Sequence, residues 1–291
     1  EKAEEIRIIK LITSKIRAEA VEINRQFEIL IALDALNAVS EFADRLSMDA
    51  PDINDGSRFV LNGAMHPLLM LQRGGGQKDF GWKDSVIPLD MVLDRDAPVM
   101  VITGPNAGGK TIAIKTAGLL LLMALSGMPV SADSSSSFPF LDRLLVDIGD
   151  EQSIESSLST FSAHISNISG IIRKADARSL VLMDELGTGT DPEEGAAISC
   201  AVLSDINKKG SYVLATTHLL DIVAFVHRSE GMVNASMEFD AEKHTPLYRL
   251  KTGEPGSSHA LDIAEKYGMP QDILVSARLM LGTMKAELES L

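Results

Sequence analysis

The sequence predicts an α/β fold built around a mixed, largely parallel sheet, and three observations lead to it. Short apolar runs typical of buried strands alternate with helical patterns between residues 57 and 255. One run, 99–102, precedes a glycine-rich turn and a long apolar helix, and another, 180–183, ends in two adjacent carboxylates. Strands that alternate with helices form parallel sheets, whose ligands bind at the carboxyl ends of the strands.

Residues 1–50 are expected to form a helical segment. Apolar residues recur there at steps of three and four between charged residues, and no Pro or Gly interrupts the pattern before Pro51. The apolar positions are Ile9, Ile12, Ile16, Ala20, Ile23, Phe27 and Leu30. Such a seam is typical of an arm that packs against a partner helix. An ordinary surface helix of the globular domain is the alternative interpretation.

Residues 57–255 are expected to form the globular domain and 256–291 a helical tail. The glycines at 74–76 predict a flexible loop, and the serine-rich stretch 131–137 predicts a mobile polar loop without an assigned function. The expected strands are 58–61, 86–93, 99–102, 144–148, 180–183 and 212–216, with a hairpin formed by 232–239 and 247–250. The expected helices are 112–125, 162–174, 192–208 and two pieces of the tail, separated at 268–270.

The segment 104–111 reads G-x-x-x-x-G-K-T and lies between a strand and a helix, which is the context of a phosphate-binding P-loop. Glycines allow the backbone to curl so that N–H groups point at phosphate oxygens, at the positive end of the helix dipole. Lys110 is expected to reach the β- and γ-phosphates, and the Thr111 hydroxyl to bind Mg²⁺. The predicted nucleotide-binding residues are Gly104, Pro105, Asn106, Ala107, Gly108, Gly109, Lys110 and Thr111. A glycine-rich turn without a ligand is the alternative.

The two carboxylates after the run 180–183 have the Walker B arrangement. Asp184 is expected to hold Mg²⁺, and Glu185 to polarise the water that attacks the γ-phosphate. A strand that ends in Asp-Glu is common by itself. Downstream of a P-loop, it favours the hydrolysis of ATP to ADP and phosphate.

Three further features narrow the class of nucleotide-binding protein. Asp191 lies six residues after Glu185, the spacing of the D-loop in ATPases of the ABC type, where this aspartate contacts the opposite subunit. His218 closes the strand 212–217, the position of the histidine that senses the γ-phosphate in that class, although a lone histidine at a strand end is often incidental. Ser159 and Thr160 precede a predicted helix, where hydroxyls cap the helix or face a phosphate.

Together these motifs resemble the MutS family of DNA mismatch-binding ATPases, over about residues 57–280. The resemblance rests on the P-loop, on Ser159-Thr160-Phe161, on 184–190 and on Thr217-His218. The segments 147–155 and 189–195 are similar to the second bacterial branch of that family. This branch is implicated in suppressing recombination and in ribosome rescue rather than in mismatch repair.

The resemblance implies a P-loop NTPase of the ABC type with an N-terminal lever helix and a C-terminal helix-turn-helix that docks on a partner ATPase. It implies a homodimer in which Ser159 and Thr160 complete the ATP site of the opposite protomer. Asn106 is then expected near the γ-phosphate, and Val86 and Ile87 beside the adenine.

Composition limits the partners. The net charge is −14, with 41 acidic against 27 basic residues, which does not suit a general nucleic-acid binder. DNA or ribosome contacts are therefore expected through regions mostly absent from this chain, because nothing resembles the family's mismatch-reading, clamp or nuclease domains. Residues 1–30 carry charges throughout and no apolar run is long enough to span a bilayer, so a cytoplasmic bacterial protein without membrane contact is expected.

The sequence thus predicts an ATP-hydrolysing motor domain that acts on branched or recombining DNA, or on stalled ribosomes. One alternative is a nucleotide-gated interaction module with little turnover, and another is an ATPase of the mismatch-repair branch. A transporter ATPase subunit is disfavoured because the sequence has no Leu-Ser-Gly-Gly-Gln signature.

Overall fold

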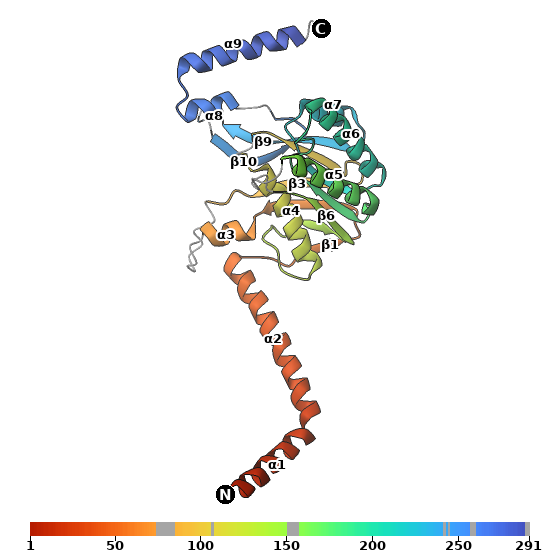
Figure 1. Ribbon diagram of the computed structural model, residues 1–291, viewed down its shortest axis with the longest axis vertical. Coiled ribbons are helices and arrows are strands. Elements are labelled where there is room, and N and C mark those ends of the chain that lie inside the picture. Colours follow the sequence, from red (N-terminus) through yellow and green to blue (C-terminus); the bar gives the residue numbers. More distant parts are fainter. Residues whose placement is uncertain are drawn as a thin grey trace. The chain divides into compact units, whose positions relative to one another are not determined.

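The structure is a computed structural model that describes residues 1–73, 85–105, 108–149, 157–240, 243, 245–256 and 260–288. For 157–160, 260, 266 and 281–288 it describes the backbone alone. The chain separates into two compact units, Glu1–Met48 and Asp49–Leu291, and the second unit holds every described strand (Figure 1). A separate domain over 256–291 stays a prediction.

The first unit consists of two helices, as the apolar periodicity predicts. Helix α1 covers Lys2–Ala18 and helix α2 covers Ala20–Leu46. Glu19 separates them, with a φ of −100° and a ψ of 7° that depart from α-helical values. The expected apolar seam is exposed, since Phe27 and Leu30 keep 64% and 62% of their surface accessible. Packing of this seam against a partner helix stays a prediction.

The second unit is organised around a six-stranded sheet of order β10-β9-β4-β8-β7-β6. Its strands are β4 (Val99–Thr103), β6 (Arg143–Asp147), β7 (Ser179–Met183), β8 (Tyr212–Thr216), β9 (Met232–Asp240) and β10 (Thr245–Thr252). Neighbours are parallel except β10, which runs antiparallel to β9. Strands β4, β7 and β8 are buried along their whole length, as in a parallel sheet covered on both faces. The predicted mixed, largely parallel sheet is confirmed.

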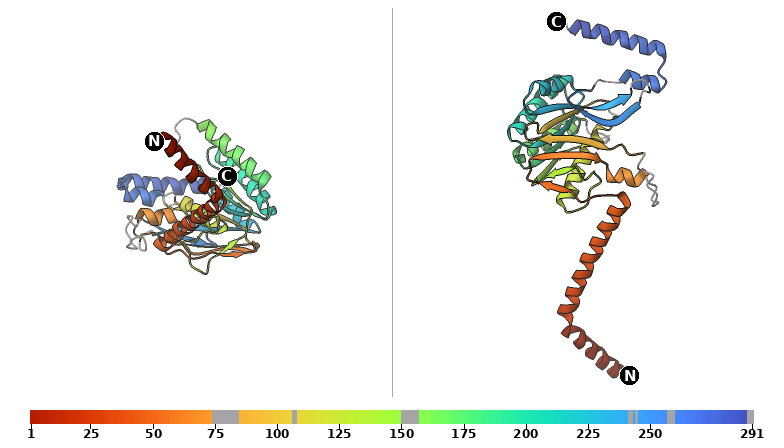
Figure 2. Two further views of the ribbon diagram at one scale, coloured as in Figure 1. Left: turned by 90° about the horizontal axis from the view of Figure 1, so that it is seen from below. Right: turned by 180° about the vertical axis from the view of Figure 1, so that it is seen from behind.

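Helices cover one face of this sheet, and helix α4 with a second sheet covers the other (Figures 1 and 2). On the first face lie α5 (Ser157–Lys174), α6 (Pro192–Lys208) and α7 (Leu220–Arg228). Their side chains Ile171, Leu203 and Val226 share a core with β7 and β8. Helix α4 (Lys110–Leu125) contacts β7 and β8 on one side and the strands β2 and β5 of the second sheet on the other. A helix enclosed in this way is apolar around its circumference, which explains the long hydrophobic run after the P-loop.

The second sheet has the order β1-β5-β2-β3. Its strands are β1 (Asp52–Asn54), β2 (Arg58–Ala64), β3 (Leu89–Asp94) and β5 (Ser137–Pro139), and helix α3 (Pro67–Arg73) follows β2. The strand predicted over 86–93 begins only at Leu89. Pro88 has no N–H to donate to a neighbouring strand and restricts the residue before it, so the ladder starts after it. The loop expected at 74–76 lies outside the described residues.

The serine-rich stretch 131–137 is not the mobile polar loop that its composition predicts. Ser131 and Ser136 are buried, with 4% and 3% of their surface exposed. The Ser131 hydroxyl donates to the carbonyl oxygen of Met65 at 2.6 Å, and the Ser136 hydroxyl to that of Asn62 at 3.1 Å. Buried hydroxyls that bond to the backbone replace their contacts with water. The two ends of the stretch therefore pack beside β2, where Ser137 begins β5, while the residues 133–135 between them are exposed.

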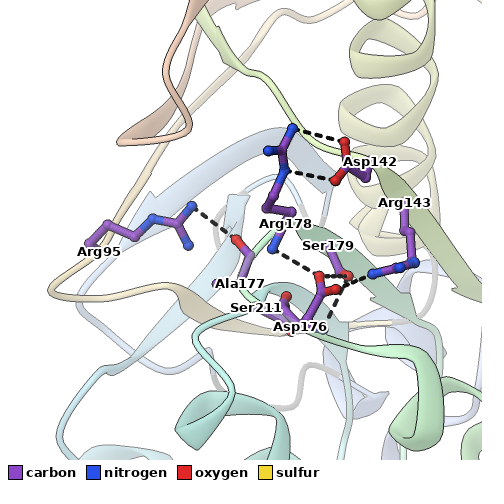
Figure 3. A network of polar contacts seen from close by, with 8 residues as sticks. All are labelled: Arg95, Asp142, Arg143, Asp176, Ala177, Arg178, Ser179 and Ser211. Carbon is purple, nitrogen blue, oxygen red and sulfur yellow. Dashed lines mark hydrogen bonds and ion pairs between the residues drawn. The ribbon is translucent and has the colours of Figure 1, made fainter.

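A polar network at the amino ends of the strands ties the two sheets together (Figure 3). Asp176, before β7, accepts a hydrogen bond from the Ser179 hydroxyl at 2.8 Å and pairs with Arg143 of β6. Arg95, in the turn after β3, donates to the carbonyl oxygen of Ala177 at 3.0 Å. The network therefore lies at the edge of the sheet opposite the P-loop.

The tail contains two helices, and the break predicted at 268–270 is confirmed. Helix α8 covers Ala260–Lys266 and helix α9 covers Gln271–Leu288. Gly268, between them, has a φ of +85°, which favours glycine. Arg278 of α9 pairs with Glu265 of α8 at 3.1 Å, so the two helices contact each other. No helix in the part of the chain that the structure describes is long and apolar enough to cross a bilayer.

Candidate nucleotide-binding site

The turn between β4 and α4 has the backbone geometry that its glycines predict. Gly104 and Gly109 have φ values of +121° and +87°, which strain any residue with a Cβ. Within the turn, the Gly108 N–H donates to the carbonyl oxygen of Pro105 at 2.9 Å. Asn106 and Ala107 of the predicted site lie outside the described residues. The turn places the amino end of α4, the positive end of its dipole, at the carboxyl edge of the sheet.

Lys110 is buried in the first turn of α4, with 4% of its surface exposed. Its Nζ donates to the carbonyl oxygen of Gly104 at 2.6 Å, so the ammonium lies back over the glycine-rich turn. Burial lowers the pKa of Lys110, while the charges of Glu185 and Asp184 act in the opposite direction. A bound phosphate would add a charged acceptor beside this buried cation. Thr111, the next residue, is half-buried.

Asp184 and Glu185 follow β7 and are joined through Thr216, the last residue of β8. The Thr216 hydroxyl donates to Asp184 Oδ1 at 2.5 Å and accepts the Glu185 N–H at 2.8 Å. Glu185 has a φ of +50°, in the left-handed region that is uncommon for residues with a side chain. The chain therefore bends at Glu185, two residues after the end of β7. Both carboxylates lie at the carboxyl edge of the sheet, the same edge that holds the P-loop, and their charges oppose the lowering of the Lys110 pKa by burial.

Two glycines pack the turn after β7 against α6. Gly187 has a φ of +89°, and a Cβ added to Gly195 would lie 2.2 Å from the Gly187 carbonyl oxygen. A side chain at Gly195 would therefore displace the turn that follows the two carboxylates. Asp191 lies at the start of α6, where its carboxylate accepts the N–H groups of Glu193 and Glu194 at 3.0 and 3.2 Å. Asp191 thus caps α6, and its contact with an opposite subunit stays a prediction.

His218 lies two residues beyond the end of β8 and is exposed. Because β8 lies between β4 and β7 in the sheet, His218 is at the edge between the P-loop and the two carboxylates. The backbone beside it is fixed by Thr217, whose hydroxyl donates to the carbonyl oxygen of Leu186 at 2.9 Å and accepts the Leu219 N–H at 3.2 Å. Strand β8 ends at Thr216, one residue before the end of the segment 212–217 that His218 was expected to close, and contact of His218 with a phosphate stays a prediction.

Tyr248 on β10 is a site residue that the sequence patterns did not indicate. A Cβ added to Gly109 would lie 3.1 Å from Tyr248 Cδ1, so the tyrosine ring lies against the P-loop. Tyr248 has a φ of +57° within an irregular part of β10, between Pro246 and Leu250. Such an irregularity redirects a side chain, and 48% of the surface of Tyr248 remains exposed. No local sequence motif predicts this contact, because Gly109 and Tyr248 lie far apart in the sequence.

The segment before β3 and the segment after β10 complete the surroundings of the P-loop. Val86 is buried and Ile87 is 39% exposed, just ahead of β3, which contacts β10. The Gly256 N–H donates to the Thr103 hydroxyl at 2.7 Å. A Cβ added to Gly256 would lie 3.2 Å from the Cα of Gly104, so the backbone after β10 approaches the P-loop closely.

Ser159 and Thr160 lie in the first turn of α5 and not before the helix. Helix α5 begins at Ser157, whereas the sequence predicted a helix from residue 162, and this prediction was wrong. Ser and Thr favour helix caps over helix interiors, which displaced the expected boundary. The amino end of a helix carries the positive end of its dipole, so this position still suits an anion.

The oxygen atoms of Thr111 and Asp184 fit Mg²⁺ that arrives with a nucleotide. In the described ranges, no three His, Cys, Asp or Glu side chains gather into a group that could hold a metal by themselves. Nucleotide sites hold Mg²⁺ with one or two protein oxygens, the phosphates and water. The donor set therefore suits a magnesium–nucleotide complex.

The glycine-rich turn, the buried lysine and the two joined carboxylates on a parallel sheet define a P-loop nucleotide-binding protein. The family model described as MutS domain V matches residues 100–285, and the chain belongs to the MutS family. Domain V is the family's P-loop ATPase domain, and the resemblance drawn from the motifs is confirmed.

Curated relatives agree with this assignment. The chain is 40% identical to the endonuclease MutS2 of Clostridium kluyveri over 291 residues, which are 100% of this chain and 36% of the relative. It is 42% identical over 278 residues to the endonuclease MutS2 of Levilactobacillus brevis and to the putative endonuclease MutS2 of Bacillus subtilis, covering 96% of this chain and 34% of each relative. The chain spans about a third of the length of these relatives.

Proposed function

We propose that this chain is an ATP-hydrolysing motor domain whose active sites are completed by a second copy of itself. The observation that carries the proposal is the pairing of Asp184 and Glu185 through Thr216, beside the buried Lys110. This arrangement presents a cation for phosphate and two carboxylates for metal and water at one edge of the sheet.

Lys110 and the amino end of α4 bind the phosphates in this proposal. On binding, the Lys110 ammonium exchanges the Gly104 carbonyl oxygen for β- and γ-phosphate oxygens. The exchange replaces a neutral acceptor with charged ones, and charge-assisted hydrogen bonds are about twice as strong as neutral ones. The nucleotide then adds negative charge beside the buried Lys110.

Thr111 and Asp184 are the residues that would hold Mg²⁺, and a bound Mg²⁺ neutralises charge on the phosphates. Glu185 orients the attacking water and accepts its proton. Its left-handed backbone directs the side chain away from the course of β7. His218, at the edge between the P-loop and the carboxylates, contacts the γ-phosphate.

Tyr248 supplies a face for the base. Its partly exposed ring lies against Gly109 of the P-loop, and aromatic side chains stack on bases with little dependence on sequence. Val86 and Ile87 form the other border of the adenine. The base therefore adds affinity to a site that Lys110 anchors on the phosphates.

The remaining donors come from the partner subunit. Ser159 and Thr160, in the first turn of α5, approach the phosphates of the opposite protomer, with Asp191 contacting the same interface. ATP hydrolysis then loosens the dimer, and the helices α1 and α2 act as the lever that transmits the change. Hydrolysis therefore depends on dimerisation.

The relatives are named endonuclease MutS2. From the resemblance to the second bacterial branch of the MutS family, the whole protein acts on branched or recombining DNA, or on stalled ribosomes, in the bacterial cytoplasm. Nuclease chemistry would lie outside this chain. The strongly acidic composition assigns nucleic-acid contacts to other regions of the protein.

The test is steady-state ATP hydrolysis measured against protein concentration. A composite site predicts specific activity that rises with concentration and levels off when the dimer is saturated. Flat, negligible activity together with tight ADP binding contradicts the motor and identifies a nucleotide-gated module. Flat but substantial activity contradicts the trans-acting donors.

A further inference from the structure

Asp147 is a buried carboxylate beside the candidate site that the proposed chemistry does not use. It ends β6, and 7% of its side chain is exposed. Its carbonyl oxygen accepts the Asp184 N–H at 2.9 Å, so it is attached directly to the residue proposed to hold the metal. Asp147 also lines a pocket between α5 and the turn after β7, together with Asp184 and Glu185.

Both oxygens of the Asp147 carboxylate are bound by α5. His164 Nδ1 lies 3.0 Å from Asp147 Oδ2, and Asn167 Nδ2 lies 2.8 Å from Asp147 Oδ1. Asn167 Nδ2 also donates to the carbonyl oxygen of Val146 at 2.9 Å. The two α5 residues are three apart in sequence and therefore lie on one face of the helix.

The His164 ring also contacts the backbone after β6. A Cβ added to Gly149 would lie 3.3 Å from His164 Cε1, so the ring lies against this glycine. His164 thus contacts Asp147, the last residue of β6, and the backbone at Gly149, two residues later. The carboxylate and the backbone at Gly149 together restrict the orientation of the His164 ring.

His164 lies one helical turn after Thr160, so both residues belong to the same face of α5. A shift of α5 along β6 would separate His164 from Asp147 and would move the first turn of the helix equally. The contact therefore fixes where that first turn lies relative to β6 and, through the Asp184 N–H, relative to β7.

We propose that His164 is a positioning residue that holds the first turn of α5 in place for the ATP site of the partner subunit. The inference rests on the proposed function, because it assigns the first turn of α5 to the opposite site. His164 lines the same pocket as Asp184 and Glu185, and in this proposal it contacts no reacting group. It acts through Asp147, which ties the donor helix of one subunit to that subunit's own carboxylate strand.

The first test is His164→Ala in the full-length protein. Turnover falls on the order of 10- to 100-fold, as for other losses of positioning. ADP affinity, measured by calorimetry, stays within about twofold, since the residues that bind nucleotide are untouched. His164→Asn restores most of the turnover, because an asparagine also carries an N–H donor at the δ position. Ser166→Ala, an exposed change on the same helix, is the matched control and has wild-type turnover.

The decisive test mixes His164→Ala with Glu185→Gln. In the mixed dimer, one site combines the intact carboxylates of the His164→Ala subunit with the intact α5 of its partner. Activity above the mean of the two separate variants supports the inference. Activity equal to that mean places the defect in the subunit's own site and overturns it, as does wild-type turnover of His164→Ala.

A parallel mixture of Ser159→Ala with Glu185→Gln separates the two proposals. If that mixture gains activity and the His164→Ala mixture does not, the inference is wrong and the composite site stands. If the Ser159→Ala mixture gains no activity, the composite site and the inference are both wrong.

Discussion

The hydroxyl of Thr216, at the end of β8, donates a hydrogen bond of 2.5 Å to Oδ1 of Asp184, which follows β7. The same hydroxyl oxygen accepts the N–H of Glu185 at 2.8 Å. One side chain at the end of β8 therefore sets the orientation of one carboxylate and the backbone of the other. The φ of +50° at Glu185 is strained, and residues hold such values only where the surroundings enforce them.

Replacing Thr216 with Val should impair both stability and turnover. The change keeps the shape but leaves the Glu185 N–H without its acceptor and Asp184 Oδ1 without its donor. Each such loss destabilises a protein by about 1–3 kcal/mol. Urea unfolding and steady-state hydrolysis measure the two effects. Thr116→Val is the control, since this buried hydroxyl bonds to Ile112 within α4, and its turnover should stay near wild type.

Glu185→Gln should stop turnover and keep nucleotide binding. An amide still fits the position but cannot accept a proton from water, which lowers turnover by about 10²- to 10⁴-fold. ADP affinity measured by calorimetry should change by less than about twofold, and the ATP-bound dimer should accumulate. Hydrolysis by Glu185→Gln at the wild-type rate would contradict the proposal that Glu185 accepts a proton from the attacking water.

Lys110→Met should abolish ATP binding without destabilising the nucleotide-free protein. Burial lowers the pKa of Lys110, so the unfolded chain binds a proton more readily than the folded one. The protonated lysine therefore lowers the free energy of unfolding, and this loss disappears as the pH rises from the pKa in the folded protein toward the ordinary pKa of lysine. The free energy of unfolding should be higher for Lys110→Met than for the wild type at about pH 7, and this difference should be smaller at about pH 9.5. A variant less stable than wild type at both values contradicts this account.

Tyr248→Ala should weaken ATP binding by about 5- to 100-fold, the range measured for the loss of base stacking on an aromatic ring. Tyr248→Phe keeps the ring and should bind ATP normally. Binding of inorganic triphosphate, which has no base, should be equal in all three proteins. Loss of triphosphate binding in Tyr248→Ala would instead show that the ring maintains the P-loop itself.

The sequence predicted best those elements that short-range chemistry defines. Helix α6 and strand β8 begin and end at the predicted residues. Their ends are marked locally by Pro192 in the first turn of the helix and by Gly210 between the two elements. The P-loop and the two carboxylates are equally local patterns.

Residues whose roles depend on tertiary contacts were missed. Thr216 looks like an ordinary strand residue in the sequence, and its role depends on the pairing of β7 with β8. Tyr248 looks equally ordinary, and its role depends on the packing of β10 beside the P-loop. Ser131 and Ser136 lie in a stretch with the composition of a loop. They are nevertheless buried, and their hydroxyls donate to backbone carbonyl oxygens of β2 and of the residue after it. The start of helix α5 was predicted too late, because the serines and threonine of its first turn resemble a cap. Composition does not reveal partners that folding brings from elsewhere in the chain.

The most direct test of the composite site mixes Glu185→Gln with Ser159→Ala in equal amounts and measures ATP hydrolysis. Random exchange makes half of the dimers mixed, and each mixed dimer has one complete site, so about a quarter of the wild-type activity should return. Each variant alone should be nearly inactive. Activity of the mixture equal to the mean of the two separate variants would contradict the composite site.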